Sequence, residues 1–121
     1  MCTKILAIDD SRTIRELLRI ALEAEDFSFE CGVDGEHGIQ KFTEFNPDLV
    51  ITDINMPKMN GFEVIKTLRG EKIQTTIPII VLTTEFSDEM KAKAKSSGAT
   101  AWIVKPFDDK NLVSVIRRLV G

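Results

Sequence analysis

Short apolar runs alternate with amphipathic segments along the chain. Each run is rich in Ile, Val and Leu and has the length of one strand, and such continuous hydrophobicity is typical of strands that are buried on both faces. The run SFEC gives the weakest signal. The pattern predicts five strands, at residues 4–8, 28–31, 48–52, 77–83 and 101–104.

The segments between these runs place apolar residues at helical spacing. Ser11, Ser87 and Asp108 are typical residues for a helix N-cap, and Gly98 is placed to end a helix. The segment before Gly98 has a thin apolar stripe, so we expect weak attachment to the core. The spacing predicts five helices, at residues 11–25, 35–45, 61–69, 87–97 and 108–120.

Strict alternation of strands and helices indicates an α/β fold with parallel strands joined by helical crossovers. We expect a doubly wound, five-stranded parallel sheet in the order 2-1-3-4-5, with helices on both faces. In such sheets ligands bind at the carboxyl ends of the strands, where the strand order reverses. The chemistry of the chain is therefore expected at the strand ends.

The length, charge and composition of the chain restrict the kinds of function that it can have. The chain has 121 residues, and we expect a single domain over 1–121 without a second output domain. A net charge of −3 with scattered basic residues disfavours nucleic-acid binding. No apolar stretch is long enough for a membrane span or an export signal, so we expect a cytoplasmic location. Cys2 and Cys31 lack metal-ligand spacing, and we expect free thiols.

Charged and hydroxyl side chains follow four of the five predicted strands. The segment LVITDINMPKMNG, for example, is hydrophobic until it reaches a carboxylate, Asp53. The carboxyl ends of parallel strands meet at one edge of the sheet, so these side chains are expected to lie together. The residues at these four strand ends are Asp9 and Asp10, Asp53, Thr83 and Thr84, and Lys105.

This set of residues predicts a phosphoryl-transfer site with its own nucleophile. Three neighbouring carboxylates repel one another unless a cation neutralises them, and oxygen ligands without His or Cys suit Mg²⁺. Two carboxylates can hold the metal while the third reacts. Lys105 can pair with Asp53 at rest and with a phosphoryl group afterwards, and the hydroxyl of Thr83 can bind the same group.

Each feature has a simpler interpretation when it is taken alone. An acidic pair is usually a solvated turn, a threonine ends many strands, and Lys-Pro and Asn-Gly pairs are common in loops. The occurrence of all these features in order at successive strand ends favours a site.

With IDDS at 8–11, DINMPKMNG at 53–61, LTT at 82–84 and KPF at 105–107, the chain resembles the receiver domain of bacterial response regulators over essentially its whole length. The resemblance implies that Asp53 is the phosphoacceptor. It implies that Asp9 and Asp10 organise Mg²⁺, with Asp10 and Asp53 as direct ligands, Asp9 acting through water and Asn55 supplying a backbone carbonyl.

The resemblance also assigns the contacts to the phosphoryl group. They come from the side chains of Thr83 and Lys105 and from the backbone N–H groups of Ile54, Asn55 and Thr84. The family usually has a cis peptide before the proline that matches Pro106. Two residues that flank the site in the family's loops, and that are expected to affect the lifetime of the phosphoryl group, are Lys58 and Glu85.

Receivers of this family work as switches. A histidine kinase donates the phosphoryl group, and the acyl phosphate biases a two-state equilibrium. Thr83 is expected to move toward the phosphate while Trp102 turns inward, which alters the face of the fourth helix, fifth strand and fifth helix. Motor-binding members more often carry Tyr at the position of Trp102. We place Lys91, Lys95 and Val115 on this partner face.

Because we expect no second domain, output is expected through protein docking. The resemblance implies a monomeric chemotaxis regulator with a histidine kinase (CheA-like) as donor, a flagellar motor switch protein as target and a phosphatase as a further partner, and no nucleic acid or membrane. A phosphorelay intermediate or a phosphate sink would share every site residue. A binding module that works without phosphorylation is a third alternative.

Two enzyme classes also use related sites. Phosphatases of the haloacid dehalogenase type carry a general acid/base Asp two residues after the nucleophile, where this chain has Asn55. A flavin mononucleotide site needs a phosphate-binding loop after the first strand, where the sequence is the acidic DDSRT. We therefore expect no enzyme for an external substrate, apart from catalysis of its own phosphotransfer and slow self-dephosphorylation.

Overall fold

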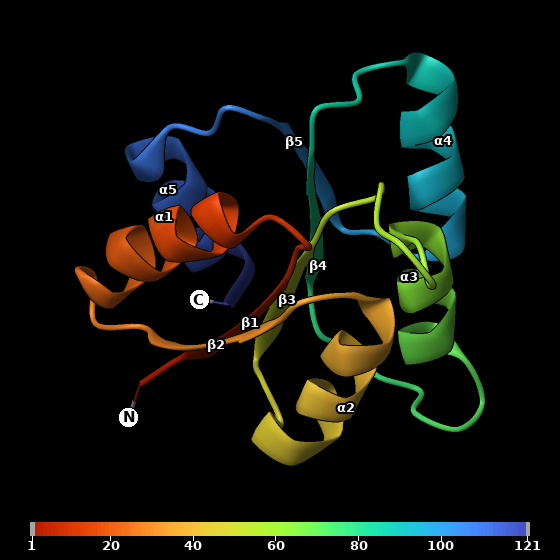
Figure 1. The fold of residues 1–121 in the computed structure, drawn as a ribbon, viewed down its shortest axis with the longest axis horizontal. Helices are drawn as coiled ribbons and strands as arrows, with labels where there is room; N and C mark the ends of the chain where they lie inside the picture. The colour runs from red at the N-terminus through yellow and green to blue at the C-terminus, as the bar shows by residue number, and fades with distance from the viewer. Residues whose placement is uncertain (1, 121) are drawn as a thin grey trace.

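The computed structural model describes residues 2–120. Within this range strands and helices alternate as the sequence pattern predicts (Figure 1). In chain order the elements are β1 Lys4–Ile8, α1 Arg12–Glu23, β2 Ser28–Gly32, α2 Gly35–Phe45, β3 Leu49–Thr52, α3 Gly61–Arg69, β4 Ile79–Thr83, α4 Asp88–Ser97, β5 Ala101–Val104 and α5 Asp109–Val120.

The strands form one parallel sheet in the order β2-β1-β3-β4-β5, which confirms the predicted fold. The chain runs from β1 outward to β2 and then crosses back to β3, so the strand order reverses between β1 and β3. Their register pairs Ile8 with Thr52. The next residues, Asp9 and Asp53, therefore leave the sheet side by side at the point where such sheets bind ligands.

Helices cover both faces of the sheet: α1 and α5 lie on one face, and α2, α3 and α4 on the other (Figure 1). Alternate residues of β1 enter two separate cores, because successive side chains of a strand point to opposite faces. Ile5 packs in the core beneath α1 and α5, while Leu6 packs in the core beneath the other three helices.

The predicted helix caps are confirmed. The side chains of Ser11, Ser87 and Asp108 accept hydrogen bonds from backbone N–H groups three residues on, at 3.3, 3.1 and 2.9 Å. Gly98 ends α4 with a φ of 117°, in the left-handed region that favours glycine. Ala94 is the one buried residue of α4, as the thin apolar stripe suggested.

Some boundaries differ from the sequence prediction. β4 begins at Ile79 rather than at 77, because Pro78 has no N–H to offer to a strand neighbour. α1 ends at Glu23, and Asp26, with a φ of 65°, turns the chain toward β2. Cys2 and Cys31 are both free thiols. Among residues 2–120 no helix has the length and apolar character needed to cross a membrane.

Candidate functional site

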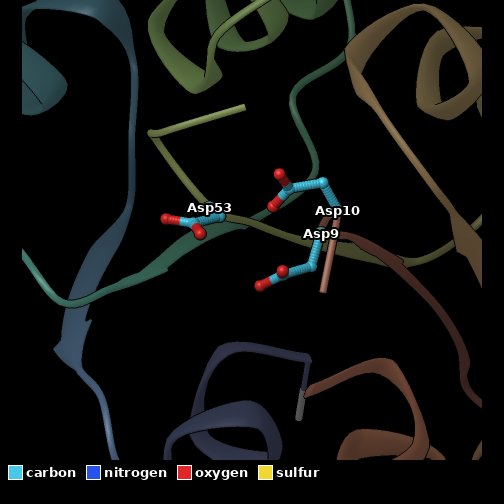
Figure 2. Close-up of side chains that lie close together, drawn as sticks. All are labelled: Asp9, Asp10 and Asp53. Atoms are coloured by element: carbon cyan, nitrogen blue, oxygen red, sulfur yellow. The ribbon is translucent and has the colours of Figure 1, made fainter. Parts of the chain in front are cut away.

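Three carboxylates converge at the ends of β1 and β3. Oxygen atoms of Asp9, Asp10 and Asp53 lie within 4.8 Å of one another (Figure 2). Asp9 and Asp53 are buried, whereas Asp10 is exposed to solvent. The cluster predicted from the strand ends is therefore present, with one carboxylate on the solvent side and two beneath it.

Lys105 bridges the two buried carboxylates. Its Nζ donates to Oδ2 of Asp9 at 2.8 Å and to Oδ2 of Asp53 at 2.9 Å. The three side chains are 10%, 3% and 10% exposed, in the order Lys105, Asp9 and Asp53, so little water screens these ion pairs. The sequence suggested only the contact with Asp53. The peptide between Lys105 and Pro106 is cis, as the resemblance implied.

Burial and ion pairing shift the pKa values of these side chains in opposite directions. Burial raises the pKa of Asp9 above its ordinary value, and this effect exceeds the lowering by the hydrogen bonds from Lys105 and the Ser11 amide. Burial also tends to lower the pKa of Lys105, but the hydrogen bonds and charges of Asp9 and Asp53 outweigh it, so the net shift is upward. Lys105 is therefore a cation at neutral pH, and burial destabilises the ionised form of Asp9.

The backbone around Asp9 is held by three other contacts. Its N–H donates to the oxygen of Gly32 at 3.1 Å, its Oδ1 accepts from the Ser11 N–H at 2.9 Å, and its backbone oxygen accepts from Nη1 of Arg15 at 2.8 Å. Sequence reasoning missed Arg15, because nothing in the helical spacing distinguishes it from the other arginines of α1.

Both oxygens of Asp53 are held by donors. Its Oδ1 accepts from the backbone N–H of Ile54 at 2.6 Å, and its Oδ2 accepts from Lys105. Thr83, fully buried at the end of β4, uses its hydroxyl oxygen to accept from the N–H of Glu85 at 3.3 Å. Thr84 is exposed at the mouth of the site. Of the residues expected to contact a phosphoryl group, Lys105 and the Ile54 N–H are therefore hydrogen-bonded to Asp53, and Thr83 ends the neighbouring strand β4.

Glu85 connects three parts of the site. Its carboxylate accepts from Nδ2 of Asn55 at 3.0 Å, and its backbone oxygen accepts from Nε1 of Trp102 at 3.1 Å. The loop after β3, the loop after β4 and strand β5 are therefore linked through one residue. In Lys58, the other flanking residue, Nζ lies 3.8 Å from Oδ2 of Asp34 at the start of α2.

The residues assigned to the partner face differ in how far their side chains are exposed to a partner. Lys91 is exposed on α4, while Lys95 and Trp102 line a hollow of about 270 Å³ beside the start of β5. Val115 is half-buried and packs against the core beneath α1 and α5, so only part of its side chain can reach a partner. Sequence reasoning missed Phe86, which is 74% exposed in the loop after β4.

The donor set fits a magnesium ion. The cluster consists of carboxylates alone, with no His or Cys among the members found in residues 2–120. Oxygen donors of this kind suit a hard divalent cation. The exposed carboxylate of Asp10 makes no hydrogen bond or ion pair within that range, which leaves it available to a ligand from solvent.

Comparisons with known proteins agree with this geometry. The model of the response regulator receiver domain family matches residues 5–117. The transcriptional regulatory protein ResD of Bacillus subtilis is 36% identical over 118 residues, and the DNA-binding response regulator MtrA of Mycobacterium tuberculosis is 35% identical over 117 residues. These matches cover 98% and 97% of this chain but 48% and 50% of those proteins, so the chain spans about half the length of these relatives.

Among solved structures, the chemotaxis protein CheY4 of Vibrio cholerae is similar, with a TM-score of 0.92 and 38% sequence identity. That match covers 98% of this chain and 99% of the CheY4 chain. The family model, the fold and the strand-end residues therefore agree on a signalling domain of the two-component type. The chain belongs to the response regulator receiver domain family.

Proposed function

We propose that the chain is a phosphorylation-controlled switch in which Asp53 accepts a phosphoryl group from the histidine of a histidine kinase. The observation that carries this proposal is the bridge from Lys105 to the buried carboxylates of Asp9 and Asp53. The ammonium group of Lys105 is within hydrogen-bond reach of both carboxylates at the reversal point of the sheet, which supports Asp53 as the nucleophile. This is the arrangement that phosphoryl transfer to a carboxylate needs.

Asp53 acts as the nucleophile. One of its oxygens attacks the phosphorus, the bond from phosphorus to the kinase histidine breaks, and an acyl phosphate forms. Lys105 then pairs with the phosphoryl oxygens, the hydroxyl of Thr83 donates to them, and further donors are the backbone N–H groups of Ile54, Asn55 and Thr84. The 2.6 Å contact between the Ile54 N–H and Oδ1 of Asp53 supports this role for the backbone.

Asp10 and Asp53 would hold Mg²⁺ directly, Asp9 would reach it through water, and Asn55 would contribute its backbone carbonyl. The bound ion supplies positive charge that neutralises the carboxylates and the phosphoryl oxygens. The cluster of three carboxylates within 4.8 Å supports this assignment.

Phosphorylation would shift an existing equilibrium between two conformations. When Thr83 turns its hydroxyl to the phosphoryl group, it gives up the hydrogen bond from the Glu85 N–H. Glu85 also accepts from Trp102, so the change passes to β5 and to the face that carries Lys91, Lys95 and part of Val115. The link through Glu85 supports Trp102 as the residue that responds.

For the output we propose docking of the phosphorylated, monomeric protein onto a flagellar motor switch protein in the cytoplasm, with a CheA-like kinase as donor. The 38% sequence identity with the chemotaxis protein CheY4 over 98% of this chain supports this. The names of ResD and MtrA, which are 36% and 35% identical to this chain, support control of transcription as the second candidate. Neither candidate requires an external substrate, and Asn55 in place of a general acid/base agrees with slow self-dephosphorylation.

The chemistry is tested by intact mass after incubation with acetyl phosphate, with and without Mg²⁺, while the fluorescence of Trp102 is followed. We expect a gain of one phosphoryl group that requires Mg²⁺, is lost in Asp53→Asn and persists in Asp109→Asn, an exposed carboxylate on α5. A change in fluorescence should accompany the gain. Absence of the gain with both acetyl phosphate and a purified kinase would refute the proposal.

The output is tested by binding to a purified flagellar motor switch protein. Affinity that rises on phosphorylation supports the chemotaxis assignment. Affinity that does not respond to phosphorylation excludes it and leaves control of transcription as the candidate to examine.

A further inference from the structure

We propose that Arg15 is a positioning residue for the magnesium site, which holds the peptide between Asp9 and Asp10 so that the Asp10 carboxylate faces the metal. The inference rests on the proposed Mg²⁺-dependent phosphorylation of Asp53. It adds a residue that contacts neither the metal nor the phosphoryl group.

The guanidinium of Arg15 donates a hydrogen bond to a backbone oxygen. It is half-buried in the first turns of α1, and its Nη1 lies 2.8 Å from the oxygen of Asp9. Within residues 2–120 Arg15 has no carboxylate partner, whereas Arg19, one turn later, has ion-pair contacts with both Glu16 and Glu23. A hydrogen bond from a charged donor is stronger than one between neutral groups, so this contact fixes the carbonyl firmly.

The held carbonyl controls the direction of Asp10. The peptide is planar, so a fixed oxygen on Asp9 also fixes the N–H of Asp10 and the bond to its α-carbon. The Asp10 carboxylate has no hydrogen bond or ion pair of its own in the described chain, so its position depends on the backbone. Asp9 differs, because Lys105 and the Ser11 N–H hold its carboxylate directly.

Charge and positioning predict opposite effects of removing Arg15. A nearby guanidinium repels a divalent cation, so loss of its charge alone should tighten Mg²⁺ binding. Loss of positioning should weaken binding, because a metal ligand that is not held by its neighbours binds less well. The sign of the change in affinity therefore separates the two roles.

The test compares Arg15→Gln with Arg12→Gln, which removes the same charge from an exposed position on the same helix. Mg²⁺ affinity is measured by calorimetry, folding by circular dichroism, and phosphorylation by intact mass at saturating Mg²⁺. We expect Arg15→Gln to bind Mg²⁺ about tenfold more weakly. Arg12→Gln should bind as wild type or more tightly. Arg15→Lys, which keeps the charge and one donor group on a shorter side chain, should fall between wild type and Arg15→Gln. The rate of phosphorylation of Arg12→Gln at saturating Mg²⁺ should stay close to that of wild type.

Unchanged or tighter Mg²⁺ binding by folded Arg15→Gln would overturn the inference. If that variant does not fold, Arg15→Lys decides, because an affinity equal to that of wild type would also overturn it. Failure of the wild-type protein to bind Mg²⁺ is a separate result, which would refute the proposed function itself.

Discussion

Gly61 packs so closely against the backbone oxygen of Asp53 that no β-carbon fits between them. A β-carbon on Gly61 would also lie 2.8 Å from the α-carbon of Ile54, and the N–H of Gly61 donates to the oxygen of Ile54 at 2.9 Å. The first residue of α3 is thus fixed on the two residues at the centre of the site. The Asn-Gly pair in the sequence has a packing role here in addition to starting a helix.

Gly61→Ala should therefore lower both stability and phosphorylation. The clash is between backbone atoms, so no side-chain rotation can relieve it. We expect the free energy of unfolding to fall by about 1–3 kcal/mol. Phosphorylation by acetyl phosphate should slow, because the peptide of Asp53 must move. Gly70→Ala at the other end of α3 is the control, since the atom nearest to its added β-carbon, the oxygen of Lys66, would be 3.0 Å away. Equal behaviour of the two variants in urea unfolding and in intact mass would contradict the prediction.

Lys105→Met should make folding depend strongly on Mg²⁺. Without the ammonium group, two buried carboxylates lose their counter-charge, and breaking such a pair costs about 3 kcal/mol. Added Mg²⁺ supplies replacement charge, so the variant should gain more stability from the ion than wild type does. Urea unfolding with and without Mg²⁺ measures this gain. Lys110→Met, at an exposed position on α5, should gain no more than wild type. A gain by Lys105→Met equal to that of wild type would argue against the prediction.

Burial of Asp9 should make the free energy of unfolding depend on pH. Burial raises the pKa of Asp9 in the folded protein above its ordinary value of 3.8, despite the hydrogen bond from Lys105. The folded state then binds this proton more tightly than the unfolded state, so protonation stabilises the fold at low pH, and this contribution is lost as the pH rises through the raised pKa. Ionised Asp9 is therefore a cost at neutral pH.

Asp9→Asn removes that cost, so its stability relative to wild type should increase as the pH rises from 3.8 toward neutrality. The raised pKa of Lys105 lies above 10.5 and does not titrate in this window. Urea unfolding of both proteins across the window provides the measurement. A stability difference that does not vary with pH would show that burial of Asp9 is not the cause.

The spacing of hydrophobic residues and the polar residues at the strand ends are the two features from which the fold and the site could be predicted. Continuous apolar runs such as residues 48–52 identify buried parallel strands, and parallel strands bring their carboxyl ends to one edge. The meeting of Asp9, Asp10 and Asp53 follows from that geometry alone. The early end of α1 depended instead on the left-handed backbone of Asp26, for which an Asp in the sequence is only a weak signal.

Contacts made by long side chains to backbone oxygens could not be predicted in this way. Arg15 reaches the oxygen of Asp9, and Trp102 reaches the oxygen of Glu85. Such contacts depend on rotamers and loop conformations, which leave no period in the sequence. The second contact of Lys105, to the carboxylate of Asp9, could not be predicted for a related reason, because it depends on how far the side chain extends across the site.

Arg69 shows the same kind of contact away from the site. Its guanidinium donates to the oxygen of Gly98 at 3.1 and 3.0 Å, to that of Thr75 at 2.9 Å and to that of Ile77 at 2.7 Å. Burial lowers the pKa of Arg69 from its ordinary value, and within residues 2–120 it has no ion-pair partner. These bonds join the end of α3 to the end of α4, where a positive charge also suits the helix dipole.

Arg69→Met should loosen α4 more than the other helices. α4 buries only Ala94, so the hydrogen bonds to Gly98 supply much of its attachment. We expect a loss of about 2 kcal/mol in the free energy of unfolding, because charged donors are removed and carbonyl oxygens are left without partners. Backbone hydrogen exchange should accelerate in α4 and stay near wild type in α2, since the acceptors of this guanidinium, at Thr75, Ile77 and Gly98, lie outside α2. Lys66→Met, at an exposed position one turn earlier on α3, is the matched control and should change neither quantity. Exchange that accelerates equally in both helices would mean that Arg69 supports the whole fold and does not anchor α4 in particular.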